Sequence, residues 1–149
     1  MFIRLQPDQV TLFWDMIKQG MISSYKIPRK FQQDFAINAL EQLLSGLSQA
    51  WIGFKFDEEN NKKIHFIMTS KIIDEKHYGV RSLHIDSIYG FRLISEDMTS
   101  EIYEGMNEYA IANNCDIMTA EYSSKRVKHF LESHGFEDHK TTCRKIVRR

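Results

Sequence analysis

Glu121 and Tyr122 end a short apolar segment, residues 117–122, whose composition is typical of a buried β-strand. In open α/β sheets, ligands bind beyond the strand ends, where the chain changes direction. A carboxylate there can serve as general base on an amine, directly or through water. We therefore take Glu121 and Tyr122 as catalytic candidates, with His84 and Asp86 of the preceding strand within reach of the same place. The alternative is an ordinary solvated carboxylate at a strand end and a strand histidine with satisfied hydrogen bonds.

The preceding strand changes the parity of its apolar residues. Leu83 and Ile85 point to one face, whereas Ile88 falls on the other if the strand is regular. One extra residue near Asp86–Ser87, a β-bulge, would bring all three to one face. Because bulges cluster beside functional sites, the parity change marks this strand as a part of the candidate site.

Four basic side chains follow Ser123–Ser124 in a predicted helix: Lys125, Arg126, Lys128 and His129. The N-terminus of a helix with basic side chains can hold a phosphate group. The alternative is a solvated helix face, since surface helices are normally charged. The spacings of the histidines and cysteines match no zinc site, so we predict no metal. The sequence also has no nucleophile elbow, P-loop or dinucleotide fingerprint.

Apolar periodicity, together with the positions of glycine and proline, predicts the elements that hold these residues. Before the bulged strand we predict strands at residues 1–5, 50–56 and 63–73, a helix from Pro7 to Gly20, and a helix from Pro28 to near Gly46. Asn60–Asn61 is a hairpin turn between the second and third of these strands. After the bulged strand we predict a helix from Ser95 to Asn113–Asn114, the strand at 117–122, a helix capped by Ser123 and ended by Gly135, and a polar edge strand at 137–147.

Composition limits the classes of partner. The charges of the 20 basic and 20 acidic residues cancel, so the chain has no net charge. Nucleic-acid binding is therefore not favoured, because it depends on neutralising phosphate charges. No apolar run approaches membrane-spanning length, and the N-terminus has no signal-peptide pattern. Two cysteines make no disulfide framework. We expect a cytoplasmic protein with no membrane association, and the sequence leaves a homodimer open.

The order of elements resembles the GNAT acetyltransferase superfamily, the acyl-CoA N-acyltransferases. The segment KHFLESHGFE, Lys128 to Glu137, is similar to the family's helix-to-strand signature, in which an aromatic-rich helix ends at Gly-Phe. The bulged strand before a long helix is similar to the family's fourth strand. The resemblance implies an α/β (α+β) fold: a mixed, mostly antiparallel sheet with helices on both faces, forming a single domain over residues 1–149.

The resemblance implies acetyl-CoA as cofactor and places its binding residues. The thioester would contact the backbone at the bulge, at Ser87, Ile88 and Tyr89, and the pantetheine arm would lie between two splayed strands. Arg92 would approach the diphosphate, while Ser124 and Lys125 would approach the 3′-phosphate. We expect the cleft between the strands to be partly filled by side chains such as Tyr89, Phe91 and Tyr122.

Three features depart from the family pattern. The family's diphosphate loop carries Gly-x-Gly or Gly-x-Ala, whereas Gly90 to Asp97 holds one early glycine and ends on Glu96 and Asp97, whose charges would repel a diphosphate. The position of the usual acid tyrosine, four residues before Gly135, is Leu131, and the family's helix-start asparagine is matched by Ser124. We therefore expect acetyl-CoA to bind weakly or not at all.

Two functional hypotheses remain open. The first is an N-acetyltransferase that moves acetyl from acetyl-CoA to the amine of a small molecule or a protein, with Glu121 as base. The second is a catalytically inactive GNAT-like module for binding or assembly. The loop at 90–97 favours the second hypothesis, because it lacks the glycines that let a phosphate approach the backbone.

Overall fold

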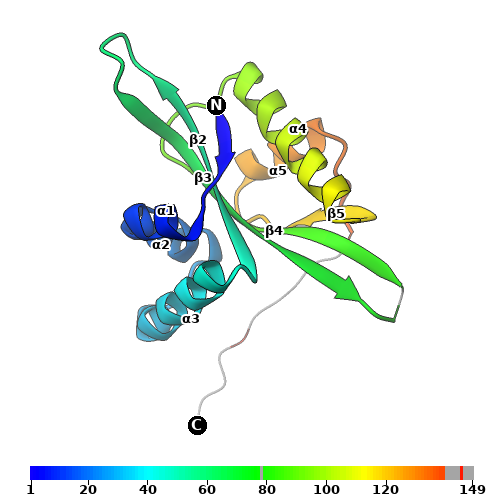
Figure 1. Ribbon diagram of the computed structural model, residues 1–149. Helices are drawn as coiled ribbons and strands as arrows, with labels where there is room; N and C mark the ends of the chain where they lie inside the picture. The colour runs from blue at the N-terminus through cyan, green and yellow to red at the C-terminus, as the bar shows by residue number, and fades with distance from the viewer. Residues whose placement is uncertain (78, 140–144, 146–149) are drawn as a thin grey trace.

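The computed structural model describes residues 1–77, 79–139 and 145. Figure 1 shows how its elements are arranged in space. In chain order they are β1 (Phe2–Arg4), α1 (Pro7–Leu12), α2 (Trp14–Tyr25), the 3-10 turn η1 (Arg29–Phe31), α3 (Gln32–Ser45), β2 (Ser48–Phe56), β3 (Lys62–Glu75), β4 (Val80–Gly90), α4 (Glu96–Ala112), β5 (Ile117–Ala120) and α5 (Lys125–Ser133).

The described strands form one mixed sheet in the order β1-β2-β3-β4-β5. The pairs from β1 to β4 are antiparallel, whereas β4 and β5 run parallel, with Ser82 opposite Ile117. Helices α1, α2 and α3 lie on one side of the sheet, and α4 and α5 lie on the other (Figure 1). The predicted fold class, a mixed and mostly antiparallel sheet with helices on both faces, is confirmed.

The core under the first three helices requires α2 to lie close to the sheet. Ile17 of α2 is fully buried there with Ile52 and Ile67 of the sheet. Gly20 was predicted to end the helix, but α2 continues to Tyr25 and Gly20 is buried within it. A Cβ atom at this position would lie 2.9 Å from Cδ1 of Ile67, so the glycine permits the close approach of helix and sheet.

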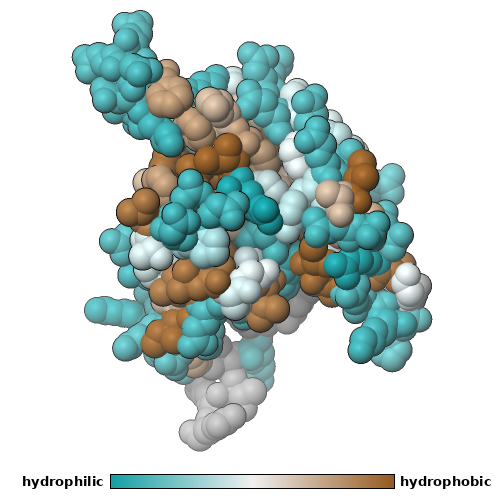
Figure 2. Space-filling model, viewed as in Figure 1, coloured by the Kyte–Doolittle hydropathy of each residue, from teal (hydrophilic) through white to brown (hydrophobic). Residues whose placement is uncertain are grey.

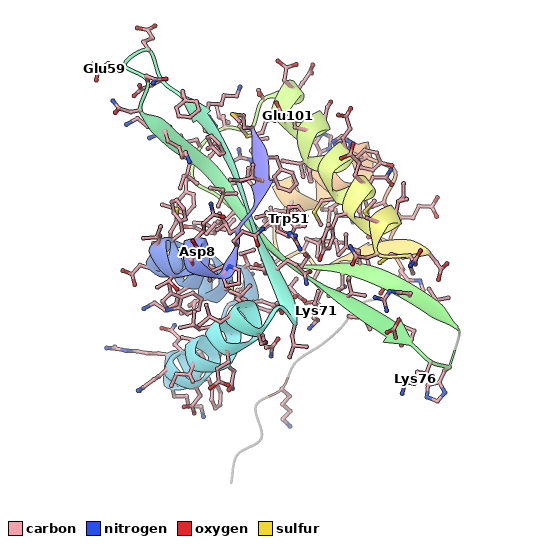
Figure 3. The ribbon with its side chains drawn as sticks, in the orientation of Figure 1. Asp8, Trp51, Glu59, Lys71, Lys76 and Glu101 are labelled. Atoms are coloured by element: carbon pink, nitrogen blue, oxygen red, sulfur yellow. The ribbon has the colours of Figure 1, made fainter. Side chains whose placement is uncertain are left out.

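The second core lies between the sheet and the helices α4 and α5. Its fully or nearly fully buried side chains include Phe66, Met98 and Met106. Trp51 of β2, labelled in Figure 3, packs against α4. Its ring meets that of Tyr109 in α4 edge to face, with the ring centroids 5.1 Å apart. Its indole N–H donates to the hydroxyl of Ser70 over 2.9 Å, which satisfies the one polar atom of this buried ring.

The predicted β-bulge is present in β4. Thr69 of β3 pairs with Ser87, and the next residue, Ser70, pairs with Ile85, so Asp86 is the extra residue. Leu83, Ile85 and Ile88 all pack into the second core as a result. A second bulge, at His65 of β3 opposite the Gly53–Phe54 step of β2, gave no parity signal in the sequence.

The hairpin between β2 and β3 carries the predicted turn. Asn60 has a left-handed backbone, with φ 62°, and the carboxylate of Asp57 accepts from the amides of Glu59 and Asn61 over 3.0 and 2.8 Å. Figure 2 shows hydrophilic residues gathered at this tip, at the upper left. Residues 58–63 at the tip are exposed to solvent, and the tip projects beyond the helices that cover the sheet (Figure 1).

Several other predicted boundaries differ from the structure. The helix predicted from Pro7 is divided at Phe13 into α1 and α2, and the strand predicted at 117–122 ends at Ala120. The helix expected from Pro28 begins as the η1 turn, and α3 starts only at Gln32. Ser124, rather than Ser123, caps α5, because its hydroxyl accepts from the amide of Val127 over 3.2 Å. Of the strand predicted at 137–147, residues 137–139 have no strand conformation, and 140–144 and 146–147 lie outside the described residues.

Candidate functional site

The parallel pairing of β4 with β5 stops early and opens a cleft. It extends over Ser82–Ile85 of β4 and ends where the amide of Glu121 donates to the carbonyl of Ile85 over 3.1 Å. Because β4 continues to Gly90, the two strands separate from there on. A cleft of about 1010 Å³ lies beyond that point, between the strands and the ends of α2, α4 and α5.

The cleft is open, which corrects the expectation that aromatic side chains partly fill it. Tyr89 and Tyr122 lie on its wall. Phe91 instead packs edge-on against the ring of Tyr89, with the centroids 5.0 Å apart, and is not part of the lining. The volume reaches the upper end of ligand pockets, roughly 300–1,000 Å³.

The backbone of Ile88 faces the gap between the strands. Its carbonyl accepts from the hydroxyl of Ser24 in α2 over 3.0 Å, so it points away from β3. The amide and carbonyl of one strand residue point to the same edge, and the amide of Ile88 therefore faces the gap as well. This amide follows the bulge and can donate to a ligand that enters between the strands.

His84 lies between two carboxylates at the mouth of this gap. Its Nε2 is 3.3 Å from Oε1 of Glu121 and 3.5 Å from Oδ1 of Asp86, while its Nδ1 is 2.7 Å from Oγ1 of Thr119. The three side chains differ sharply in exposure: 7% for Asp86, 13% for His84 and 62% for Glu121. The bulge and the end of β5 thus bring together the residues that the sequence selected.

Two residues that the sequence did not indicate complete this cluster. The ammonium of Lys71, labelled in Figure 3, is 3.4 Å from Oδ1 of Asp86. The hydroxyl of Tyr25 in α2 hydrogen-bonds the same carboxylate. Burial raises the pKa of Asp86, although the Lys71 and His84 side chains and the Tyr25 hydroxyl oppose the rise. Burial, followed by the charges of Asp86 and Glu121, raises the pKa of Tyr25 far above its ordinary value, so this hydroxyl keeps its proton.

Solved structures with a similar architecture include acetyltransferases. The chain matches a predicted acetyltransferase with acetyl-CoA from Clostridium acetobutylicum at TM-score 0.70 and 15% identity, over 98% of this chain and 95% of that one. It matches an aminoglycoside N-acetyltransferase in complex with CoA at TM-score 0.66 and 9% identity, over 100% and 95% of the two chains. A ribosomal-protein-alanine N-acetyltransferase from Brucella melitensis gives TM-score 0.64 at 11% identity, over 100% and 99%. The chain has the GNAT acetyltransferase fold.

The likeness rests on structure alone. No family model and no curated protein matches the sequence. At these identities a shared fold says nothing of substrate, since one fold serves many functions. No helix in the described part of the GNAT-fold chain is long and apolar enough to cross a membrane. Among the described residues, no three histidine, cysteine, aspartate or glutamate side chains are grouped so as to hold a metal ion.

The loop that binds diphosphate in GNAT enzymes is tied to β3 in this chain. The amides of Phe91 and Arg92 both donate to the carbonyl of His65, the residue at the second bulge, over 2.8 and 3.2 Å. The side chain of Arg92 does not line the cleft. The amide of Met98 donates to the capping hydroxyl of Ser95, which also accepts from Nζ of Lys55 over 2.8 Å. Lys55 thus supplies a cation at the N-terminus of α4 that the sequence did not reveal.

Helix α5 forms the opposite wall of the cleft. Ser124 at its start and Arg126 and His129 in its first turns line the cleft, whereas Lys125 does not. Leu131, at the position of the usual GNAT acid, is 4% exposed in the second core. The structure therefore offers no acid at that position.

Tyr122 reaches the cleft, but a partner holds its hydroxyl. The hydroxyl donates to Oδ1 of Asp138 over 2.8 Å, and Lys128 lies near both. This hydrogen bond is the main cause of the raised pKa of Tyr122. Glu121 and Tyr122 stay predictions as catalytic residues, as do Ser87, Ile88 and Tyr89 at the cofactor. Ser87 itself is buried, with its hydroxyl bonded to that of Thr69 over 2.5 Å.

Proposed function

We propose that this GNAT-fold chain is an N-acyltransferase that transfers acetyl from acetyl-CoA to an amine. The observation that carries the proposal is one side chain: the carboxylate of Glu121, held by His84, opens into the cleft at the point where β4 and β5 separate. Acyl transfer to an amine needs a proton acceptor for the nitrogen and hydrogen-bond donors for the carbonyl oxygen. Glu121 is the acceptor, and the amide of Ile88 is the donor.

Acetyl-CoA, when bound, supplies an activated thioester, so that the bond from carbon to nitrogen forms as the bond from carbon to sulfur breaks. Glu121 accepts the proton that the nitrogen loses, and its exposure lets it pass that proton to solvent. The amide of Ile88 donates to the carbonyl oxygen as negative charge develops there. Tyr122 is the candidate for returning a proton to the departing sulfur, once its hydroxyl leaves Asp138.

The residues around the cleft suit the pantetheine end of acetyl-CoA better than its diphosphate end. The open gap beside Ile88 has room for a pantetheine arm, and the cleft is lined by Ser124 and Arg126 on the side of α5. At α4, two of the loop amides are already engaged by His65, and the first turn is acidic. Lys55 offsets this charge only in part. We therefore propose that the donor binds weakly and mainly through its pantetheine half.

The acceptor amine approaches from the side of α2. Ser23 and Ser24 near the end of that helix line the same cleft as Glu121. The exposed carboxylate of Glu121 lies at this side and attracts a protonated amine before it loses its proton. The amine of a small molecule or of a protein side chain fits this description.

A catalytically inactive binding module is the second candidate. The observation that favours it is the burial of Leu131 where GNAT enzymes carry their acid, together with the acidic first turn of α4. The two candidates predict different outcomes with acetyl-CoA. A transferase releases the thiol of CoA, whereas a binding module binds its partner and releases no thiol.

The test is thiol release from acetyl-CoA in the presence of a panel of primary amines, followed by mass spectrometry of the products. Polyamines, aminoglycosides and lysine- or alanine-containing peptides sample small-molecule and protein acceptors. We expect an acetylated product that depends on the enzyme with at least one amine. If acetyl-CoA stays intact with every amine while the folded protein is at high concentration, the transferase proposal is wrong and the binding module is favoured.

A further inference from the structure

We propose that His84 is a positioning residue that holds Glu121 in its working place by sharing one N–H between Glu121 and the buried Asp86, with Tyr25 and Lys71 fixing Asp86. The proposal deepens the proposed function and rests on it for its effect on rate. The placement of the proton in the free protein follows from geometry alone.

The distances decide which nitrogen of His84 carries the hydrogen. Nε2 faces carboxylate oxygens of both Glu121 and Asp86, at 3.3 and 3.5 Å. A lone pair on Nε2 would point at two negative oxygens, so the charges around the ring favour a hydrogen on Nε2, between the two carboxylates. Nδ1 is then the acceptor for the hydroxyl of Thr119 at 2.7 Å. Thr119 on β5 thereby sets the tautomer of a histidine on β4.

Asp86 is the fixed end of the series of side chains formed by Asp86, His84 and Glu121. It is the extra residue of the bulge, and its side chain is 7% exposed. Lys71, directly opposite His84 in the register of β3 and β4, neutralises its charge. The Tyr25 hydroxyl donates a hydrogen bond to it from α2. Three elements of the fold therefore hold Asp86 in place.

Glu121 is the free end. It follows the last residue of β5, and its side chain is 62% exposed. Among the described residues, the side chain of Glu121 has His84 as its ion-pair partner. The charged and titratable groups that face His84 are Lys71 from β3, Asp86 from β4, Glu121 after β5 and the hydroxyl of Tyr25 from α2. With Lys71 and Asp86 paired, Glu121 carries the remaining negative charge and is the group left to accept a proton.

The first test uses the full chain without any ligand. Imidazole 15N shifts assign the tautomer of His84 at about pH 8.5, two units above the ordinary histidine pKa of roughly 6.5. We expect a hydrogen on Nε2. An Nε2 without hydrogen would overturn the proposal. Because this readout needs no turnover, a chain with a protonated Nε2 and no acyl transfer would contradict the proposed function and leave the proton placement standing.

The second test is kinetic and uses an amine that the wild type acetylates. His84→Ala removes the shared donor, and we expect kcat to fall roughly 10- to 100-fold with little change in KM, because misplacement of a reacting group costs this much. His84→Gln keeps an N–H near the position of Nε2, and we expect it to recover a substantial part of the loss. Equal activities of the two variants would overturn the proposal.

The variant Tyr25→Phe tests whether the hydrogen bond from Tyr25 to Asp86 matters for the rate. Loss of its hydroxyl frees one side of Asp86, and we expect kcat to fall by roughly tenfold with KM retained. The matched control is Tyr109→Phe, whose hydroxyl contacts Arg4 on the other face of the sheet and which should keep the wild-type rate. Wild-type kcat in Tyr25→Phe, with the fold intact by circular dichroism, would show that Asp86 needs no such support.

Discussion

The Nε2 atom of His84 lies 3.3 Å from Oε1 of Glu121, although one residue belongs to β4 and the other follows β5. The two strands are parallel neighbours that separate immediately beyond these residues. The contact therefore stands at the point where the sheet opens into the cleft. It places a carboxylate where the nitrogen of an acceptor would meet an acyl group bound in the gap.

Acetyl-CoA binding should be weak and should be limited by the carboxylates at α4. We expect a dissociation constant above the micromolar range at physiological salt in calorimetric titration. Glu96→Gln should tighten binding by about fivefold, because Glu96 lines the cleft and one carboxylate near a diphosphate costs on the order of 1 kcal/mol. Glu104→Gln, exposed and further along α4, is the control that should leave the affinity nearly unchanged. A sub-micromolar constant for the wild type would contradict this account.

Leu131 should act on stability. It is 4% exposed in the second core, so Leu131→Ala should lower the free energy of unfolding by roughly 2–5 kcal/mol through lost burial and a new cavity. Leu12→Ala, at a residue 80% exposed, should change the stability by less than about 0.5 kcal/mol. Urea unfolding monitored by tryptophan fluorescence measures both. If Leu131→Ala has the same free energy of unfolding as the wild type, the side chain faces the cleft and its position is open to a catalytic role.

The β-bulge shows how much of the site the sequence could predict. A strand whose apolar residues change parity at Ile85 and Ile88 must carry an extra residue if one face is to be buried, and the structure has that residue at Asp86. A short apolar run likewise predicted the strand that places Glu121, although β5 ends at Ala120, before Glu121, and the predicted strand ran to Tyr122. Local patterns were sufficient here because the burial of one strand face leaves its own periodicity in the chain.

Tyr25, Lys71 and Lys55 could not be predicted, since their roles depend on contacts between distant segments. Tyr25 reaches Asp86 only because α2 continues past Gly20, and a glycine in a helical pattern normally signals its end. The reason for that glycine is Ile67 of the sheet beneath it, which is far away in sequence. Lys71 meets Asp86 through the register of β3 with β4, which a single strand does not encode.

The stability of Asp86→Asn relative to the wild type should rise with pH. Burial raises the pKa of Asp86 in the folded protein above its ordinary value of 3.8. The folded state then binds more protons than the unfolded state between these two values, so wild-type stability falls as pH rises through that window. The asparagine variant lacks this term. Melting temperatures of both proteins between about pH 3.5 and pH 6.5 measure the difference, and a difference that stays constant would contradict the raised pKa.

The measurement that tests the account most directly is kcat/KM for acetyl transfer by Glu121→Gln. Glutamine keeps the size of the side chain and its contact with His84 but cannot accept the proton of an amine. We predict a loss of roughly 10²–10⁴-fold. Glu108→Gln, an exposed glutamate on α4, should keep the wild-type value. If Glu121→Gln acetylates the amine as fast as the wild type, Glu121 is not the base and the reading of this cleft as an acyl-transfer site built around it is wrong.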